Sequence, residues 1–155
     1  PHVTLLMRFA DCVPILLYDP KKSVIGIVHA GWQGTVKQIV KHAVETIGRR
    51  YHVDPVDLVA GIGPSIGPDH YEVGENVFLE ATQSFGDNAE AFFTHDNGSL
   101  FFNLWKANGF LLESSGVKNI QYANICTACH VTDWYSHRAE NGKTGRFAAV
   151  IALQA

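Results

Sequence analysis

The sequence predicts a mixed α/β fold, either an α/β or an α+β sandwich built on mixed sheets, from three observations. Short apolar runs rich in branched side chains alternate with helical patterns along the 155 residues. The first strands are joined by a short turn, which favours an antiparallel hairpin over the crossovers of a plain doubly wound sheet. Hydrophobic residues make up 46% of the chain, so we expect one core and a single domain over residues 1–155.

Three strands are predicted near the N-terminus. Val3–Phe9 and Val13–Tyr18 are apolar and of strand length, with "ADC" between them. Asp19–Ser23, "DPKKS", has turn chemistry, because its proline presets φ and its aspartate is able to bond the backbone beyond it. Val24–Val28 then returns as the partner of the second run, so these two runs form the predicted hairpin.

A helix after Gly34 is the most regular pattern in the sequence. Apolar residues recur there at helical spacing, and charged residues lie outside the apolar stripe. Gly48 lies near the expected end of this helix. The stripe consists of Val36, Ile39, Val40, Ala43, Val44 and Ile47.

The remaining predicted elements are shorter. Glycines and prolines between residues 61 and 68 indicate an irregular loop, and residues 86–99 look like a polar connection. The other elements are a strand at Leu58–Ile62, a helix at Glu75–Ser84, a strand and helix within "LFFNLWKANGFLLESSG" ending near Gly116, and strands at Ile120–Ile125 and Phe147–Leu153.

Composition and charge exclude some classes of partner. The net charge is −3, the pI is near 6.2 and the basic residues are scattered, so we expect no nucleic-acid and no membrane partner. No apolar run approaches the roughly 20 residues that cross a bilayer. Three cysteines do not make a disulfide framework, so a reducing, cytoplasmic location is expected. The eight histidines are a more specific indication of function than the net charge, because imidazole binds metals and transfers protons.

Cys12 and His29 form the first candidate site. They are seventeen residues apart, each at or beside the end of an apolar strand, and the hairpin would bring them together. A thiolate and an imidazole are ligands of Zn²⁺, although two ligands leave a tetrahedral site incomplete. The same pair is suited to act as a nucleophile and its base. The structural alternative is a buried core cysteine beside a histidine bonded to the backbone.

The corner "HAGWQG" follows this strand. Gly31 and Gly34 allow the backbone to approach a ligand closely, and the helix that begins there has free N–H groups for an anion. Trp32 offers an aromatic face for a flat ring, or it simply covers the edge of the sheet.

The segment "GIGPSIGPDHY" is a second candidate. A loop of this composition, with Gly63 and Gly67, is able to cradle phosphate through backbone N–H groups, although it matches neither the P-loop nor the GxGxxG pattern. Asp69 and His70 add polar groups that would line a site. A simple turn is the structural alternative.

The segment "CTACH", Cys126–His130, matches the pattern of c-type haem attachment, but covalent haem implies an exported protein, for which the sequence has no signal. A CxxC zinc knuckle needs a second ligand pair, which we expect the chain to lack. A redox CxxC is also open, although the motif does not begin a helix after a strand. A tight turn of small side chains and a site-lining role are equally compatible with it.

The segment "WYSHRAENGKTGRF" is the last candidate. It places the cationic groups of His137, Arg138 and Arg146 near a glycine-containing loop, which suits phosphate or carboxylate. A solvated surface loop is the alternative.

These segments, in this order, resemble one known family. The segments are "ADCVPILLYDP", "HAGWQGT", "GIGPSIGPDHYEVG", "NLWKAN", "CTACH" and "WYSHRAENGKTGRFAAVIAL". They are similar to YfiH-like laccase-domain proteins, also called multicopper polyphenol oxidoreductases, whose members are regarded as purine nucleoside phosphorylases. The resemblance runs over essentially all 155 residues. It implies an α/β/β/α sandwich and phosphorolysis of adenosine, inosine, guanosine and methylthioadenosine, with adenosine deaminase activity.

The resemblance also implies a zinc site of two histidines and one cysteine. By position, Cys12 and His29 are two of these ligands, and the third is a histidine of an upstream "HG" motif that this sequence does not contain. The chain is therefore expected to be the C-terminal part of a longer protein. Its partners would be small-molecule purine nucleosides and phosphate.

The other residues take roles that suit such a site. Zn²⁺ would activate a water for attack on adenine, or organise phosphate and nucleoside for displacement at the ribose. The candidate roles are Trp32 on the purine ring, Arg138, Arg146, Gly63 and Gly67 on phosphate, and Asp11 and His70 in proton transfer.

Three other functions are alternatives. Copper-dependent polyphenol oxidation would use Cu²⁺, although laccase sites need many histidine ligands at several coppers. A cysteine hydrolase would use Cys12 as nucleophile and His29 as base. The third alternative is a non-catalytic binding domain.

Overall fold

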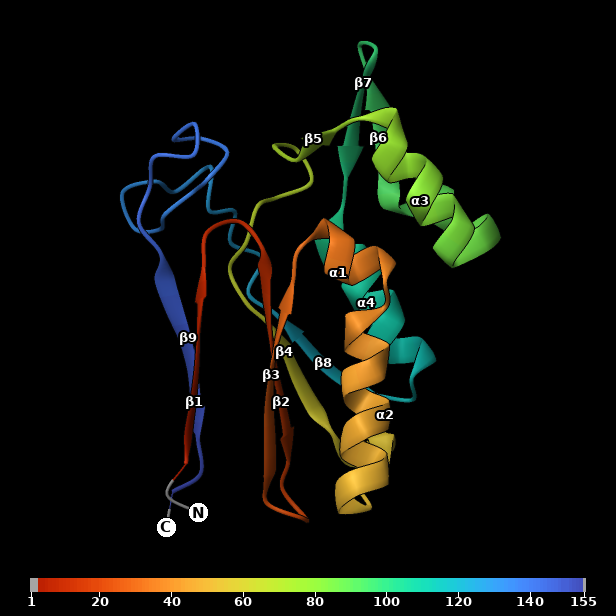
Figure 1. Ribbon diagram of the computed structural model, residues 1–155, viewed down its shortest axis with the longest axis vertical. Helices are drawn as coiled ribbons and strands as arrows, with labels where there is room; N and C mark the ends of the chain where they lie inside the picture. The colour runs from red at the N-terminus through yellow and green to blue at the C-terminus, as the bar shows by residue number, and fades with distance from the viewer. Residues whose placement is uncertain (1–2, 155) are drawn as a thin grey trace.

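The computed structural model describes residues 3–154 and confirms the mixed α/β class (Figure 1). In chain order the elements are β1 (Thr4–Phe9), β2 (Val13–Asp19), β3 (Val24–Ala30), α1 (Trp32–Val36), α2 (Ile39–Tyr51), η1 (Pro55–Asp57), β4 (Val59–Ile62), β5 (Glu72–Val73), α3 (Glu75–Phe85), η2 (Gly86–Phe92), β6 (Phe93–Asp96), β7 (Ser99–Phe102), α4 (Leu104–Ser114), β8 (Asn119–Tyr122) and β9 (Phe147–Ala152).

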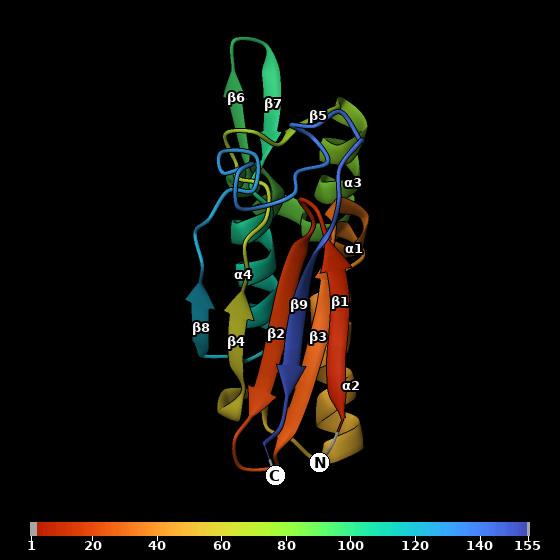
Figure 2. The ribbon, with the colours of Figure 1, turned by 90° about the vertical axis from the view of Figure 1, so that its left-hand side faces the viewer.

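The elements form stacked layers. A four-stranded sheet in the order β3-β2-β4-β8 lies at the centre, and β8 is parallel to β4 while the other neighbours are antiparallel. Helices α2 and α4 cover one face of this sheet, and the two-stranded ribbon of β1 and β9 lies over the other face (Figures 1 and 2). These layers correspond to the α/β/β part of the expected sandwich.

The predicted hairpin is confirmed as β2 and β3. Val13 lies opposite Ala30 and Asp19 opposite Val24, so the antiparallel register runs along the whole of both strands. The Asp19 carboxylate accepts hydrogen bonds from the backbone N–H groups of Lys21 and Lys22, as expected for an aspartate that begins a turn. Because both strands end together, the residues just before β2 and just after β3 lie side by side.

The predicted helix after Gly34 is two helices, α1 and α2. The helix is interrupted at Gln38, whose φ of 56° is left-handed and does not fit a continuous helix. The Gln38 amide donates hydrogen bonds to the backbone oxygen and hydroxyl of Ser84, which hold this break against the end of α3. Most of the predicted stripe is confirmed, since Val40, Val44 and Ile47 of α2 are buried.

The prediction that residues 86–99 form a polar connection is wrong, because this segment contains the 3₁₀ helix η2 and strand β6. Phe92 and Phe93 are buried there, so the segment contributes to the core. Strands β6 and β7 form a hairpin around Asn97-Gly98, both with positive φ. An Asn-Gly pair between two apolar runs is a strong hairpin signal, and it identifies this turn.

The two ends of the described chain pair with each other. Strand β1 is antiparallel to β9, with Thr4 opposite Ala152 and Phe9 opposite Phe147. The predicted strand Ile120–Ile125 is shorter and begins earlier, as β8. No helix within residues 3–154 combines the length and the apolar character that crossing a membrane requires.

Candidate active site

A cavity of about 430 Å³ opens where the end of β1 meets the corner after β3; we call it the Cys12 cavity. It gathers most of the side chains that the sequence singled out, together with several others. The lining residues are Arg8, Ala10, Asp11, Cys12, His29, Trp32, Tyr71, His137, Arg138 and Arg146.

Cys12 and His29 line the same cavity, as the hairpin reading predicted. Cys12 directly precedes β2 and His29 lies near the end of β3, opposite Pro14. Gly31 is needed at this corner, because a Cβ on it would lie 2.8 Å from the Cys12 sulfur. The His29 ring stacks on Phe9, with ring centroids 4.5 Å apart, and this contact fixes the plane of the imidazole.

Burial shifts both of these groups toward their uncharged forms. The pKa of the Cys12 thiol is raised, mainly by burial and further by the Asp11 charge, while Arg146 opposes the shift. The pKa of His29 is lowered by burial. A nucleophilic cysteine requires the opposite shift, so the metal-free pair is poorly suited to hydrolase chemistry.

Asp11 is buried at the edge of the cavity and joins three segments of the chain. Its two carboxylate oxygens accept hydrogen bonds from the Thr127 hydroxyl at 2.7 Å and from the Arg138 backbone N–H at 2.6 Å. Its φ is 78°, a left-handed value that aspartate tolerates better than most residues. The carboxylate therefore holds the Arg138 segment at the cavity.

Cationic and aromatic side chains form another part of the lining. The Arg138 guanidinium donates a 2.8 Å hydrogen bond to the Glu72 backbone oxygen and lies 5.2 Å from the centroid of the Tyr71 ring. Burial raises the pKa of Tyr71 to about 12, so this phenol stays neutral. The Arg146 guanidinium bonds the backbone oxygens of Thr144 and Gly145. Together with Trp32, these groups offer flat faces and anion-binding donors to one ligand.

The glycine-rich loop lies elsewhere, and its donors are occupied. The Gly63 N–H donates to the Pro14 oxygen at 2.8 Å, and the Gly67 N–H donates to the Cys126 sulfur at 3.1 Å. Neither glycine is among the described residues that line the Cys12 cavity. Backbone N–H groups already bonded within the protein are not free to cradle a phosphate, so these two glycines offer no donors to a ligand in this cavity.

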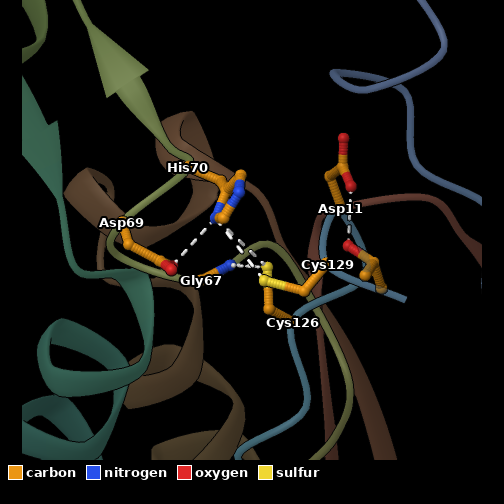
Figure 3. A network of polar contacts seen from close by, with 7 residues as sticks. Asp11, Gly67, Asp69, His70, Cys126 and Cys129 are labelled. Carbon is orange, nitrogen blue, oxygen red and sulfur yellow. Dashed lines mark hydrogen bonds and ion pairs between the residues drawn. The ribbon is translucent and has the colours of Figure 1, made fainter. Parts of the chain in front are cut away.

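His70 is also outside this cavity and belongs to a second group of side chains. Asp69, His70, Cys126 and Cys129, which we call the CxxC cluster, place their potential ligand atoms within 4.8 Å of one another (Figure 3). Asp69 and His70, in the loop between β4 and β5, thus lie beside the CxxC motif, whereas no second ligand pair was expected for it from the sequence. No local pattern in the sequence shows that the two segments meet.

Sequence reasoning missed Arg8 and Tyr71 as lining residues. Arg8 carried a usable signal, since it is the one charged residue in the apolar run "VTLLMRF". Tyr71 follows "PDH" and had no distinct signal. A larger hollow of about 770 Å³ lies at the opposite end of the ribbon, between the β2–β3 turn and the end of β9. It has no comparable convergence of thiol, imidazole and guanidinium groups.

Comparison with known proteins identifies the family of this chain. The family model described as multi-copper polyphenol oxidoreductase laccase matches residues 1–154. Purine nucleoside phosphorylase YlmD of Bacillus subtilis is 36% identical over 99% of this chain and 56% of its own length. A purine nucleoside phosphorylase of Deinococcus radiodurans is 39% identical over 99% of this chain and 58% of its own length. The chain thus spans somewhat more than half the length of the curated relatives it matches.

Solved structures share the fold closely. YfiH of Bacillus licheniformis has a TM-score of 0.94 and 37% identity, covering 99% of this chain and 59% of that one. YlmD of Geobacillus stearothermophilus has a TM-score of 0.90 and 34% identity, covering 96% of this chain and 56% of that one. The fold, the order of the motifs and the family match agree, and the chain belongs to the multi-copper polyphenol oxidoreductase laccase family.

Proposed function

We propose that this protein, in its intact form, catalyses phosphate-dependent cleavage of purine nucleosides in the Cys12 cavity. The observation that carries the proposal is the set of groups that meet there: a thiol, two imidazoles, an indole and three guanidinium groups. A nucleoside and a phosphate need flat apolar contacts and cationic donors side by side. The names of the relatives, which are purine nucleoside phosphorylases, support the same substrate class.

The donor chemistry of Cys12 and His29 fits the Zn²⁺ that the family resemblance implies. Both face one cavity, and thiolate and imidazole are ligands that zinc prefers. Two ligands leave the coordination incomplete, so a further ligand is part of this proposal; the resemblance places it in an upstream histidine. When bound, Zn²⁺ supplies Lewis-acid activation of the nucleophile, which serves phosphorolysis and adenosine deamination alike.

The chain's own residues bind and orient the two substrates. Arg138 and Arg146 neutralise the phosphate, and the Tyr71 face and the Glu72 oxygen hold the Arg138 side chain in place. Trp32 packs on the purine ring and excludes water from the ribose carbon that is attacked. The phosphate oxygen forms a bond to that carbon as the bond to the purine nitrogen breaks, and the proton that the hydrogen phosphate carried ends on the departing purine nitrogen.

Asp11 acts by positioning in this scheme. Both of its oxygens already accept protein hydrogen bonds, so it holds the backbone of Arg138 and does not transfer the proton itself. The location proposed for the protein is the reducing cytoplasm expected from its cysteine content.

A phosphorolysis assay of the intact, zinc-loaded protein tests the proposal. Inosine and adenosine are incubated with and without phosphate, and free base, ribose 1-phosphate and deaminated product are separated chromatographically. We expect base release that requires phosphate. Arg138→Ala lowers kcat/KM by about 100-fold, whereas the matched Arg50→Ala, on the exposed face of α2, does not.

Several outcomes would contradict this assignment. Base release that is independent of phosphate, or no turnover of any purine nucleoside, would refute phosphorolysis. Phenol oxidation that needs added copper, in protein inactive on nucleosides, would favour the oxidase alternative that the family description suggests. Activity that survives in a Cys12→Ser variant that has lost its zinc would refute the role of zinc in catalysis, and full zinc binding by that variant would refute Cys12 as a ligand.

A further inference from the structure

We propose that the CxxC cluster is a second metal site, which binds one Zn²⁺ through Asp69, His70, Cys126 and Cys129. It joins the loop between β4 and β5 to the segment that follows β8. None of its four residues lines the Cys12 cavity. The site is therefore separate from the one on which the proposed function depends.

The spacing of the ligand atoms fits one tetrahedral ion. His70 Nδ1 lies 3.9 Å from the Cys126 sulfur, 3.6 Å from the Cys129 sulfur and 3.1 Å from Asp69 Oδ1. Around a tetrahedral zinc, a sulfur and a nitrogen ligand are about 3.6 Å apart, and a nitrogen and an oxygen ligand about 3.3 Å. The four groups already surround the volume of a single ion, so binding needs only small adjustments.

Hydrogen bonding alone does not account for this arrangement. His70 Nδ1 is a single atom that faces a carboxylate and two sulfurs, as Figure 3 shows for the labelled side chains. One proton on that nitrogen makes a good hydrogen bond to only one of these three neighbours at a time. A cation in the centre interacts with all of them at once.

The donor set and its surroundings favour zinc. Two thiolates and an imidazole select Zn²⁺ over Mg²⁺ and Ca²⁺, which prefer all-oxygen ligands. Cys126 is buried, and the Gly67 N–H donates to its sulfur, a contact that stabilises a thiolate ligand. A Cβ on Gly67 would lie 3.0 Å from that sulfur and 2.6 Å from Asp69 Oδ1, so a larger residue would push these two ligand atoms aside. Asp69, His70 and Cys129 are exposed, which leaves a path for the ion.

This site would support the Cys12 cavity without contacting the substrate. Thr127 directly follows Cys126, and its hydroxyl donates to Asp11, which in turn holds the Arg138 backbone. Backbone bonds between Ser65 and the residues on both sides of Cys126 already align the two segments. A metal at the CxxC cluster fixes this alignment, and its role is structural.

Cobalt titration of the intact protein tests the site directly. A Cys12→Ser/His29→Gln background removes the proposed first site, and the reduced protein is titrated with Co²⁺ under a reductant that does not bind metal. We expect one equivalent to bind, with intense tetrahedral visible bands and a thiolate-to-cobalt absorption band. Zn²⁺ then displaces the cobalt and abolishes both signals.

Cys129→Ser in this background is the decisive variant, because the residue is exposed and its replacement spares the core. We expect at least a 100-fold weaker affinity and a weaker charge-transfer band, and a smaller loss for Asp69→Asn. The matched control Asp87→Asn, at an exposed position of η2, leaves the binding unchanged. Three results would overturn the proposal: no bound equivalent in the background protein, binding unaffected by Cys129→Ser, or a Cys126–Cys129 disulfide that persists under reductant. Each readout is independent of turnover, so failure of the proposed function is recognised separately.

Discussion

Replacement of Asp11 by alanine tests whether one buried carboxylate holds two segments at the cavity. Its oxygens accept from Thr127 at 2.7 Å and from the Arg138 backbone at 2.6 Å, and the residue is 7% exposed. A hydrogen bond to a charged group contributes about 1.5–3 kcal/mol. Alanine at the φ of 78° adds about 1 kcal/mol of backbone strain. At the low end of these ranges, the free energy of unfolding falls by about 4 kcal/mol.

Two further variants separate these contributions. Asp11→Asn keeps one acceptor oxygen and tolerates the positive φ, so we expect a loss of about 1–2 kcal/mol. Thr127→Val removes one of the two bonds at nearly constant shape and should cost about 1–3 kcal/mol. Urea unfolding followed by circular dichroism and tryptophan fluorescence measures all three values. In thermal unfolding, each kcal/mol lowers Tm by about 2–4 °C in a domain of this size.

The ranking of the variants decides the interpretation. An alanine variant within about 1 kcal/mol of the parent protein, the ordinary range of surface substitutions, would show that the carboxylate does not join these segments. An asparagine variant as unstable as the alanine variant would show that charge, and not acceptor number, dominates.

The other predictions concern the core, one loop and one buried hydrogen bond. Leu17→Ala, at a fully buried site of β2, should cost about 2–5 kcal/mol in urea unfolding, and the same truncation at Leu6, 58% exposed, far less. The pKa of Glu140 is held below its usual range by a threonine hydroxyl and a backbone N–H. Its contribution to loop stability is therefore present at neutral pH and lost as pH falls through that lowered pKa. An NMR titration of the carboxyl carbon measures this pKa, and Glu140→Gln should remove the pH-dependent loss of loop stability. Trp105→Phe removes the 2.6 Å hydrogen bond to the Ser65 hydroxyl and should lower the free energy of unfolding by about 1 kcal/mol. A double-mutant cycle with Ser65→Ala measures the coupling between the two residues, and a coupling energy of zero would show that the bond contributes nothing.

Elements with a strong local period were predictable. The apolar stripe of α2 and the turn between β2 and β3 are set by residues within a few positions of one another. The break at Gln38 was not predictable, because the residue is held by a contact with Ser84, far along the chain. Strand β6 was missed because charged and polar residues obscured the Asn97-Gly98 turn signal.

Among the candidate site residues, too, those brought together by neighbouring segments were predictable and those brought together by distant segments were not. Cys12 and His29 lie beside the ends of two strands joined by a short turn, so the hairpin alone brought them to one cavity. Tyr71 and Arg138 come from segments far apart in sequence, and only folding placed the guanidinium over the ring.

The sequence by itself determined the local elements, the Cys12–His29 pair and the family resemblance, because each depends on residue types at short or fixed spacing. Only the tertiary structure decided that β1 pairs with β9 and that Asp69 and His70 lie beside the CxxC motif. It also decided that backbone N–H groups of the glycine-rich loop donate to other parts of the protein. Such meetings depend on how whole layers pack, and a local pattern carries no information about which distant loop becomes its neighbour.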